Sequence, residues 1–100
     1  MINSIRINLQ AVKINPNWTG LKFYLFGSAL TSIKSNDIDL LIEYDSETLS
    51  IENALQLRTE IARKLYQVFR CTVDIILLNR NEHIQSQFID HENGILLFSI

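Results

Sequence analysis

Two aspartates open a segment that otherwise has the composition of a buried strand. Asp37 and Asp39 alternate with apolar residues in the run "DIDLLIEY", residues 37–44. Because successive side chains of a strand point to opposite faces, both carboxylates share one face, with about 7 Å between their α-carbons. A third acid, Asp74, interrupts a second apolar run, "TVDIILL", residues 72–78. Carboxylates gathered in this way repel one another and raise each other's pKa.

A divalent cation would relieve that repulsion. Mg²⁺ prefers oxygen ligands and usually combines one or two protein carboxylates with water and substrate phosphate. The pattern therefore predicts that Asp37, Asp39 and Asp74 hold metal ions. Taken singly, each acid is better explained as a turn residue or as the partner of a Lys or Arg. The combination of three acids on two apolar strands favours the metal site.

A glycine and a serine come shortly before the two aspartates. Gly27 and Ser28 directly follow the aromatic and apolar run "LKFYLF", residues 21–26. A glycine at a strand end lets the backbone approach a ligand closely, and a following turn offers N–H groups and a hydroxyl to a phosphate. Alone, Gly-Ser after a strand is usually only a turn. Ahead of Asp37 and Asp39, it predicts a site that grips phosphates at one end and holds a metal at the other.

The spacing of the apolar residues predicts the elements that position these groups. Apolar residues three or four apart indicate a first helix that begins near Ile2 and a long amphipathic helix over 51–70. One more helix is expected within 79–93, with Ile84 and Phe88 facing inward. Short apolar runs predict four strands, at 21–26, 37–44, 72–78 and 95–99. This order of helices and strands indicates an α/β fold, in which helices back a small sheet.

Composition limits the class of protein. The chain has 100 residues, 47% of them hydrophobic, and is predicted to form one globular domain over residues 1–100. The apolar runs fall far short of the ~20 residues that span a bilayer, so no membrane segment is expected. A single cysteine, Cys71, fits a reducing compartment, and we expect a cytoplasmic location. Nine scattered basic residues and a net charge of −2 argue against a dedicated nucleic-acid surface.

Two histidines offer a weaker alternative metal site. His83 and His91 lie eight residues apart on the expected helix within 79–93, close to acidic residues. Metal-binding histidines on a helix would more naturally lie four residues apart. We therefore interpret both histidines as solvent-exposed helix residues.

The stretch "FGSALTSIKSNDIDLLI", followed by "VDIILL", resembles the signature of nucleotidyltransferases of the DNA polymerase beta superfamily. The resemblance covers about residues 21–98, and the short chain is similar to the minimal nucleotidyltransferases. In bacteria and archaea these are commonly encoded beside a helical HEPN partner, as antitoxins that can transfer AMP to the toxin. Carried over residue by residue, the resemblance makes Gly27 and Ser28 the nucleotide-phosphate grip. It makes Asp37 and Asp39 metal ligands and Asp74 the third carboxylate.

The resemblance implies a polymerase beta palm-like α/β fold with a small mixed sheet. It also implies ATP or another nucleoside triphosphate as substrate, two Mg²⁺ ions, a HEPN-type helical protein as partner and possible homo-oligomers. The segment between Ser28 and Asp37 is shorter than usual in the family and has Lys34 as its only cation, which we expect to lie in solvent. Two alternatives stay open: an antitoxin that neutralises its partner by occlusion, and a structural domain whose acids pair with bases.

Overall fold

Helices and strands alternate along the chain in the structure, a computed structural model that describes residues 2–14, 17–30 and 37–100. The elements in order are α1 (Ile2–Gln10), β1 (Lys22–Phe26), the short 3₁₀ helix η1 (Gly27–Leu30), β2 (Asp37–Tyr44), α2 (Ile51–Phe69), β3 (Thr72–Asn79), α3 (Arg80–Ser86), α4 (Phe88–Glu92) and β4 (Ile95–Ser99). The four predicted strands and the long helix lie within one or two residues of their expected bounds. Lys34 lies outside the described residues.

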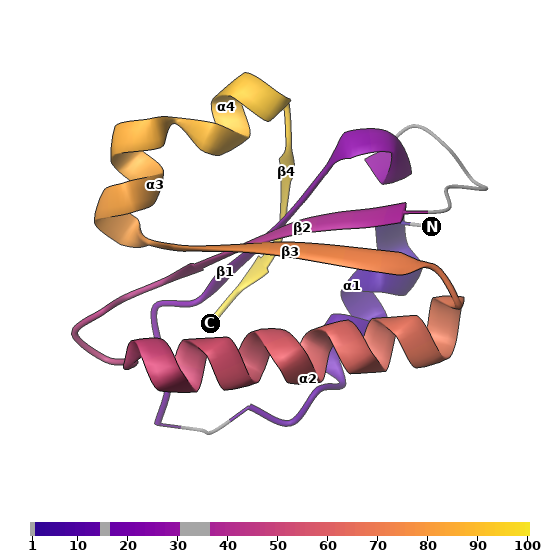
Figure 1. The fold of residues 1–100 in the computed structure, drawn as a ribbon, viewed down its shortest axis with the longest axis horizontal. Coiled ribbons are helices and arrows are strands. Elements are labelled where there is room, and N and C mark those ends of the chain that lie inside the picture. The colour runs from indigo at the N-terminus through magenta and orange to yellow at the C-terminus, as the bar shows by residue number, and fades with distance from the viewer. Residues whose placement is uncertain (1, 15–16, 31–36) are drawn as a thin grey trace.

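The strands form one mixed sheet in the order β3-β2-β1-β4. β1 is antiparallel to both β2 and β4, whereas β2 and β3 run parallel. The helices α1 and α2 lie on one side of this sheet, and α3 and α4 lie on the other (Figure 1). The α/β class with a small mixed sheet is therefore confirmed.

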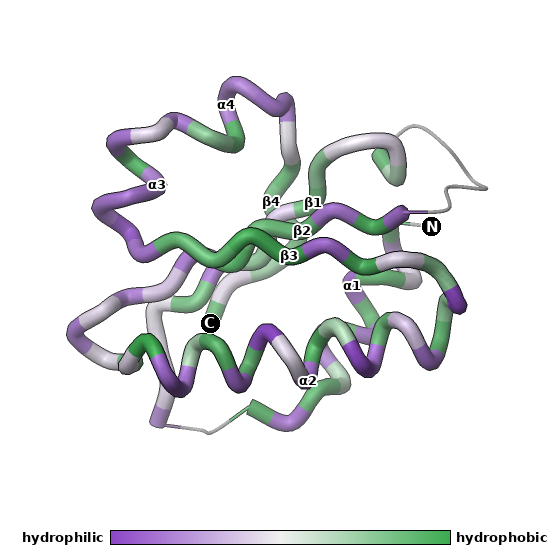
Figure 2. The backbone as a smooth tube through the Cα atoms, viewed as in Figure 1, coloured by the Kyte–Doolittle hydropathy of each residue, from purple (hydrophilic) through white to green (hydrophobic). Residues whose placement is uncertain are grey.

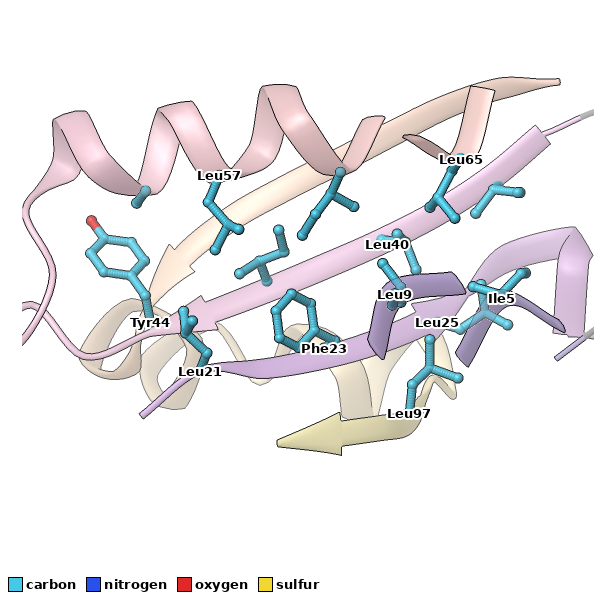
Figure 3. Packing of buried hydrophobic residues seen from close by; sticks show 14 of the residues in the cluster. Ile5, Leu9, Leu21, Phe23, Leu25, Leu40, Tyr44, Leu57, Leu65 and Leu97 are labelled. Atoms are coloured by element: carbon cyan, nitrogen blue, oxygen red, sulfur yellow. The ribbon is translucent and has the colours of Figure 1, made fainter. Parts of the chain in front are cut away.

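The main core fills the space between the sheet and the helices α1 and α2 (Figure 3). On β2, every second residue from Ile38 onward points into it, and Ile38, Leu40 and Ile42 are fully buried. The facing side of α2 contributes residues at helical spacing, namely Ala54, Leu57, Ile61 and Leu65. Since side chains alternate along a strand, the same register turns Asp37 and Asp39 to the other side of the sheet.

Capping defines both ends of α2. The Ser50 side chain accepts a hydrogen bond from the backbone N–H of Asn53, as an N-cap does. At the other end Arg70 adopts a left-handed conformation, with φ of 54°, and its N–H donates to the carbonyl of Tyr66. The helix consequently stops at Phe69 and the chain turns directly into β3.

The segment 79–93 differs from the single helix that the sequence predicts. It forms two short helices, because Gln87 has φ of 50° and so breaks the helical path between α3 and α4. The prediction that Ile84 faces inward is wrong, since this side chain is 65% exposed. Phe88 does pack inward, edge-to-face against Phe26 with ring centroids 5.0 Å apart. The break at Gln87 therefore changes the direction of the chain between α3 and α4.

Hydropathy follows the layers of the fold. The hydrophobic residues concentrate along the strands in the middle of the molecule, while α3 and the end of α4 are largely hydrophilic (Figure 2). None of the helices in the described part of the chain combines the length and apolar character needed to cross a membrane.

The packing of α2 predicts a contrast between two of its leucines. Leu57 is 1% exposed, so Leu57→Ala should lower the free energy of unfolding by about 2–5 kcal/mol through lost burial and the cavity left behind. Leu55, on the outer face of the same helix, is 40% exposed, and Leu55→Ala should change the value by less than about 0.5 kcal/mol. Urea unfolding followed by circular dichroism measures both; equal losses would contradict the assigned core face.

Candidate active site at the start of β2 and β3

The pairing of β2 with β3 brings the three predicted acids together. In the parallel register Asp39 lies opposite Asp74, and Asp37 lies opposite Thr72. Neighbouring strands are about 4.8 Å apart, and residues opposite each other point to the same face. The backbone therefore places Asp37, Asp39 and Asp74 side by side on the face away from α2, near the starts of both strands.

The turn after β1 completes the same corner of the sheet. Phe26 pairs with Asp39, so Gly27 comes directly beside this carboxylate. A β-carbon built on Gly27 would overlap the Oδ2 atom of Asp39 and lie 3.2 Å from its Cγ, and the residue has φ of +77°. Only glycine fits here without strain. The exposed Ser28 follows at the start of η1, so both predicted phosphate-grip residues adjoin the acids.

Electrostatic repulsion concentrates on Asp39, which is half-buried while Asp37 and Asp74 are exposed. Burial raises the pKa of the Asp39 carboxyl above its ordinary value of 3.8, and the neighbouring charge of Asp74 raises it further. Asp37 and then Glu92 add to the same pKa shift. The ionised form of Asp39 is thus disfavoured in the folded chain.

Glu92 is a fourth acid that the sequence did not point to. It lies at the end of α4, next to the left-handed residue Asn93, and its charge acts on Asp39. In the sequence it resembles any exposed helix residue, because no spacing relates it to Asp37, Asp39 or Asp74. Only the return of the chain from α4 into β4 brings it to this corner.

The chemistry of these groups fits a hard cation. Carboxylate oxygens are the ligands that Mg²⁺ prefers. Burial and then the neighbouring acids raise the pKa of Asp39, and a cation would offset both by favouring the ionised carboxylate. As the side chains stand, however, no three His, Cys, Asp or Glu groups in the described part of the chain come close enough together to hold a metal ion. The strand register therefore suits a metal site, and the side-chain positions do not converge on one point.

The two histidines have different environments. The exposed position of His91 agrees with the sequence prediction. For His83 the prediction is wrong, because its side chain is only 12% exposed and its Nδ1 lies 2.8 Å from Oε1 of Glu43. Glu43, on the same face of β2 as Asp39, is the one charged residue that is buried in the described part of the chain. The apolar run around Glu43 hid this pair in the sequence.

Comparison with known proteins decides the family. The model of the family "Polymerase beta, Nucleotidyltransferase" matches residues 15–100. The chain belongs to this nucleotidyltransferase family. The matched region of the nucleotidyltransferase includes every predicted site residue, from Gly27 to Asp74. No match was found among curated protein sequences.

Solved structures share the fold of this nucleotidyltransferase. One is a mutant of the toxin–antitoxin MntA-HpeT, with a TM-score of 0.59 and 22% identity over 100% of this chain and 74% of that chain. A second is a toxin–antitoxin with AMP-PNP, with a TM-score of 0.57 and 25% identity over 99% of this chain and 73% of that one. A third comes from Shewanella oneidensis, with a TM-score of 0.53 and 20% identity over 99% and 71%. The resemblance to minimal nucleotidyltransferases is thereby confirmed.

The contact between Gly27 and Asp39 leads to a prediction about coupling. Gly27→Ala should lower the free energy of unfolding by about 1–3 kcal/mol, because a side chain at this φ is strained and overlaps the carboxylate. Adding Asp39→Ala removes the overlap but leaves the backbone strain. Urea unfolding of the two single variants and the double variant should therefore give a coupling energy above about 0.5 kcal/mol. Additive effects would mean that the two residues do not touch.

The raised pKa of Asp39 predicts a pH-dependent gain from its neutralisation. Above its folded-state pKa the ionised carboxylate opposes folding, so Asp39→Asn should raise the free energy of unfolding at pH 7 in metal-free buffer. The gain should shrink as the pH falls through the folded-state pKa, and vanish below the unfolded value, near 3.8. Chemical unfolding of both proteins from pH 3 to pH 7 measures this difference; a gain that grows toward low pH would refute it.

Proposed function

We propose that this nucleotidyltransferase transfers AMP from ATP to a hydroxyl group on a partner protein, with Mg²⁺ as cofactor. The observation that carries the proposal is the register that sets Asp39 opposite Asp74, with Gly27 beside them. Two adjacent strands as rich in apolar residues as β2 and β3 would ordinarily have apolar residues on this face as well. Three acids at that position suit the binding of cations, which would in turn hold the phosphates of a substrate.

Each residue has a role in this proposal. Gly27 and Ser28 bind the phosphates through backbone N–H groups and the hydroxyl, because η1 begins directly at the end of β1. Asp37 and Asp39 would hold Mg²⁺, with Asp74 sharing a second ion. Bound Mg²⁺ neutralises phosphate charge and lowers the pKa of the acceptor hydroxyl. Asp74 is the exposed acid on the outermost strand of this corner, so an acceptor from another protein has access to it.

In the proposed transfer step, these groups account for the bond that forms, the bond that breaks and the proton that is released. The acceptor oxygen attacks the α-phosphorus, a new oxygen–phosphorus bond forms, and the bond to the β-phosphate breaks in line with it. Asp74 takes the proton of the acceptor hydroxyl as a general base. The products are the AMP-modified acceptor and pyrophosphate.

The solved structures support the proposal that the acceptor lies on a toxin. Two of the similar structures are toxin–antitoxins, and one of them has AMP-PNP. We accordingly propose that this chain is the antitoxin of such a pair, that the acceptor lies on a toxin, and that this toxin is a helical protein of the HEPN type. We also place the pair in the cytoplasm, in keeping with the free Cys71.

A second candidate is an antitoxin that binds and occludes its toxin without transferring a nucleotide. The observation that favours it is the spread of the acidic side chains, which do not gather into a metal-binding group in the described part of the chain. Both candidates need the same fold and the same partner. They differ only in whether label moves from ATP to the toxin.

Transfer of label tests the proposal directly. The chain, incubated with its toxin, Mg²⁺ and ATP labelled at the α-phosphate, should label the toxin. Asp37→Asn, Asp39→Asn and Asp74→Asn should each reduce this by about 100-fold or more, because the lost charge removes several kcal/mol of metal-dependent stabilisation. Glu47→Gln is the matched control, since Glu47 is exposed in the turn at the opposite end of β2. Toxin that is neutralised but never labelled would support occlusion instead.

A further inference from the structure

A buried hydrogen bond outside the acidic corner joins α3 to β2. His83 Nδ1 lies 2.8 Å from Glu43 Oε1, and the two side chains are 12% and 5% exposed. Since a carboxylate only accepts, the Nδ1–H of His83 donates this bond. A protein with a buried ionic pair is often no more stable than the same protein with apolar residues of similar volume in its place. The pair therefore suggests a role in placing α3 rather than in overall stability.

His83 is the main partner that Glu43 has. Among the described residues, the second oxygen, Oε2, is buried without a hydrogen-bond partner. Lys22 Nζ comes no closer than 4.0 Å to it and belongs to a half-exposed side chain. Removing the His83 donor would thus leave both oxygens of a buried carboxylate without a hydrogen bond, which strongly disfavours the present position of α3.

Packing does little to hold α3 in place. The helix, all of which the structure describes, buries none of its residues. A cavity of about 370 Å³ lies along it and is lined by Glu43, His83, Ile84, Gln87, Ile89 and Asp90. The His83 ring also meets Tyr24 edge-to-face, with centroids 5.2 Å apart. The other side-chain tie of α3 to this end of β2 is the ion pair of Arg80 Nη2 with Asp45 Oδ2, which are 3.9 Å apart on side chains that are 52% and 24% exposed. The buried contacts of His83 are therefore the main side-chain contribution to the position of α3 among the described residues.

The contacts continue from α3 to the acidic corner. After the break at Gln87, the Phe88 ring packs against Phe26, which precedes Gly27 and is the strand partner of Asp39. At the end of α4, Glu92 acts electrostatically on Asp39. In Figure 1, α3 and α4 form one continuous layer beyond the sheet, on the side away from α2. A displacement of α3 would reach the site through Phe88 and Phe26.

We infer that Glu43 and His83 are positioning residues for the active site. Their hydrogen bond holds the α3–α4 cap, defined as residues 80–92, against β1 and β2. The cap in turn presses Phe88 on Phe26 and fixes the turn at Gly27, where the phosphates bind. The effect on nucleotide transfer rests on the proposed function, whereas the effect on the cap and on Gly27 does not.

Two substitutions of His83 separate this role from general packing. His83→Asn keeps a donor at the position of Nδ1, and His83→Gln moves the donor toward the position of Nε2; both lose the ring contact with Tyr24. His83→Gln should speed amide hydrogen exchange in residues 80–92 by about 5–100-fold, the range for an unsatisfied buried group. Exchange in α2 should stay unchanged. His83→Asn should stay close to wild type in both segments.

The same two variants also test whether the cap affects the site, through the NMR signal of Gly27 and the kinetics of label transfer. In ¹⁵N-correlated NMR spectra, His83→Gln should move the Gly27 amide signal and His83→Asn should not. In the labelling assay His83→Gln should raise the KM for ATP and reduce kcat/KM by at least about 5-fold, again as expected from one lost buried hydrogen bond. Glu43→Gln, which keeps an acceptor at Oε1, should retain most of the activity, while Glu43→Leu, which leaves the His83 donor without its acceptor, should shift the exchange and the activity in the same direction as His83→Gln.

Distinct outcomes would overturn the inference. Equal exchange rates in His83→Asn and His83→Gln would show that the hydrogen bond does not hold the cap. A loosened cap with an unmoved Gly27 signal would show that the cap does not position the site. If the wild-type chain transfers no label, the proposed function fails, and the exchange and NMR measurements still decide whether Glu43 and His83 position Gly27.

Discussion

The parallel pairing of β2 with β3 is the constraint on which the site depends. It sets Asp39 opposite Asp74 and so forces like charges together at the start of two otherwise apolar strands. Residues paired in this way cannot separate unless the strands slide. Burial of Asp39 and, after it, the charge of Asp74 therefore raise the pKa of the Asp39 carboxyl as a consequence of the fold. Only a proton or a bound cation relieves the repulsion.

The core on the other side of the sheet keeps this arrangement in register. Ile38, Leu40 and Ile42 are fully buried against the helical layer. A slip of one residue would turn these side chains toward α3 and α4 and bring the aspartates into the core. Burial of three apolar residues on one face thus positions two acids on the other.

Sequence patterns revealed this half of the fold because the pattern and the packing coincide. The two-residue alternation of β2 and the three- and four-residue spacing of α2 both reflect burial against a single partner layer. The acids were noticeable because they break an apolar run, and Gly27 because it ends one. Such signals are local, and they predicted the strands, the long helix and the grouping of Gly27 with the acids.

The cap over the opposite face carried no comparable signal. The break at Gln87 depends on a left-handed residue that is not glycine, which propensity does not foresee. Glu43 and His83 are forty residues apart, and their pairing follows from the position of α3 rather than from any spacing. Ile84 was assigned to the interior by its hydrophobicity alone. Contacts between distant segments organise this side of the molecule, a polar one between Glu43 and His83 and an apolar one between Phe26 and Phe88.

The two faces consequently differ in how they respond to a ligand. The core face consists of closely packed apolar side chains. The acidic face carries unrelieved charge, and whatever binds the folded chain and neutralises that charge stabilises it by mass action. If the chain binds Mg²⁺ and nucleotide as proposed, they should tighten the α3–α4 cap more than α2, because only the cap shares the acidic face. This coupling needs no large movement of the strands, since their register already places the acids and Gly27 together.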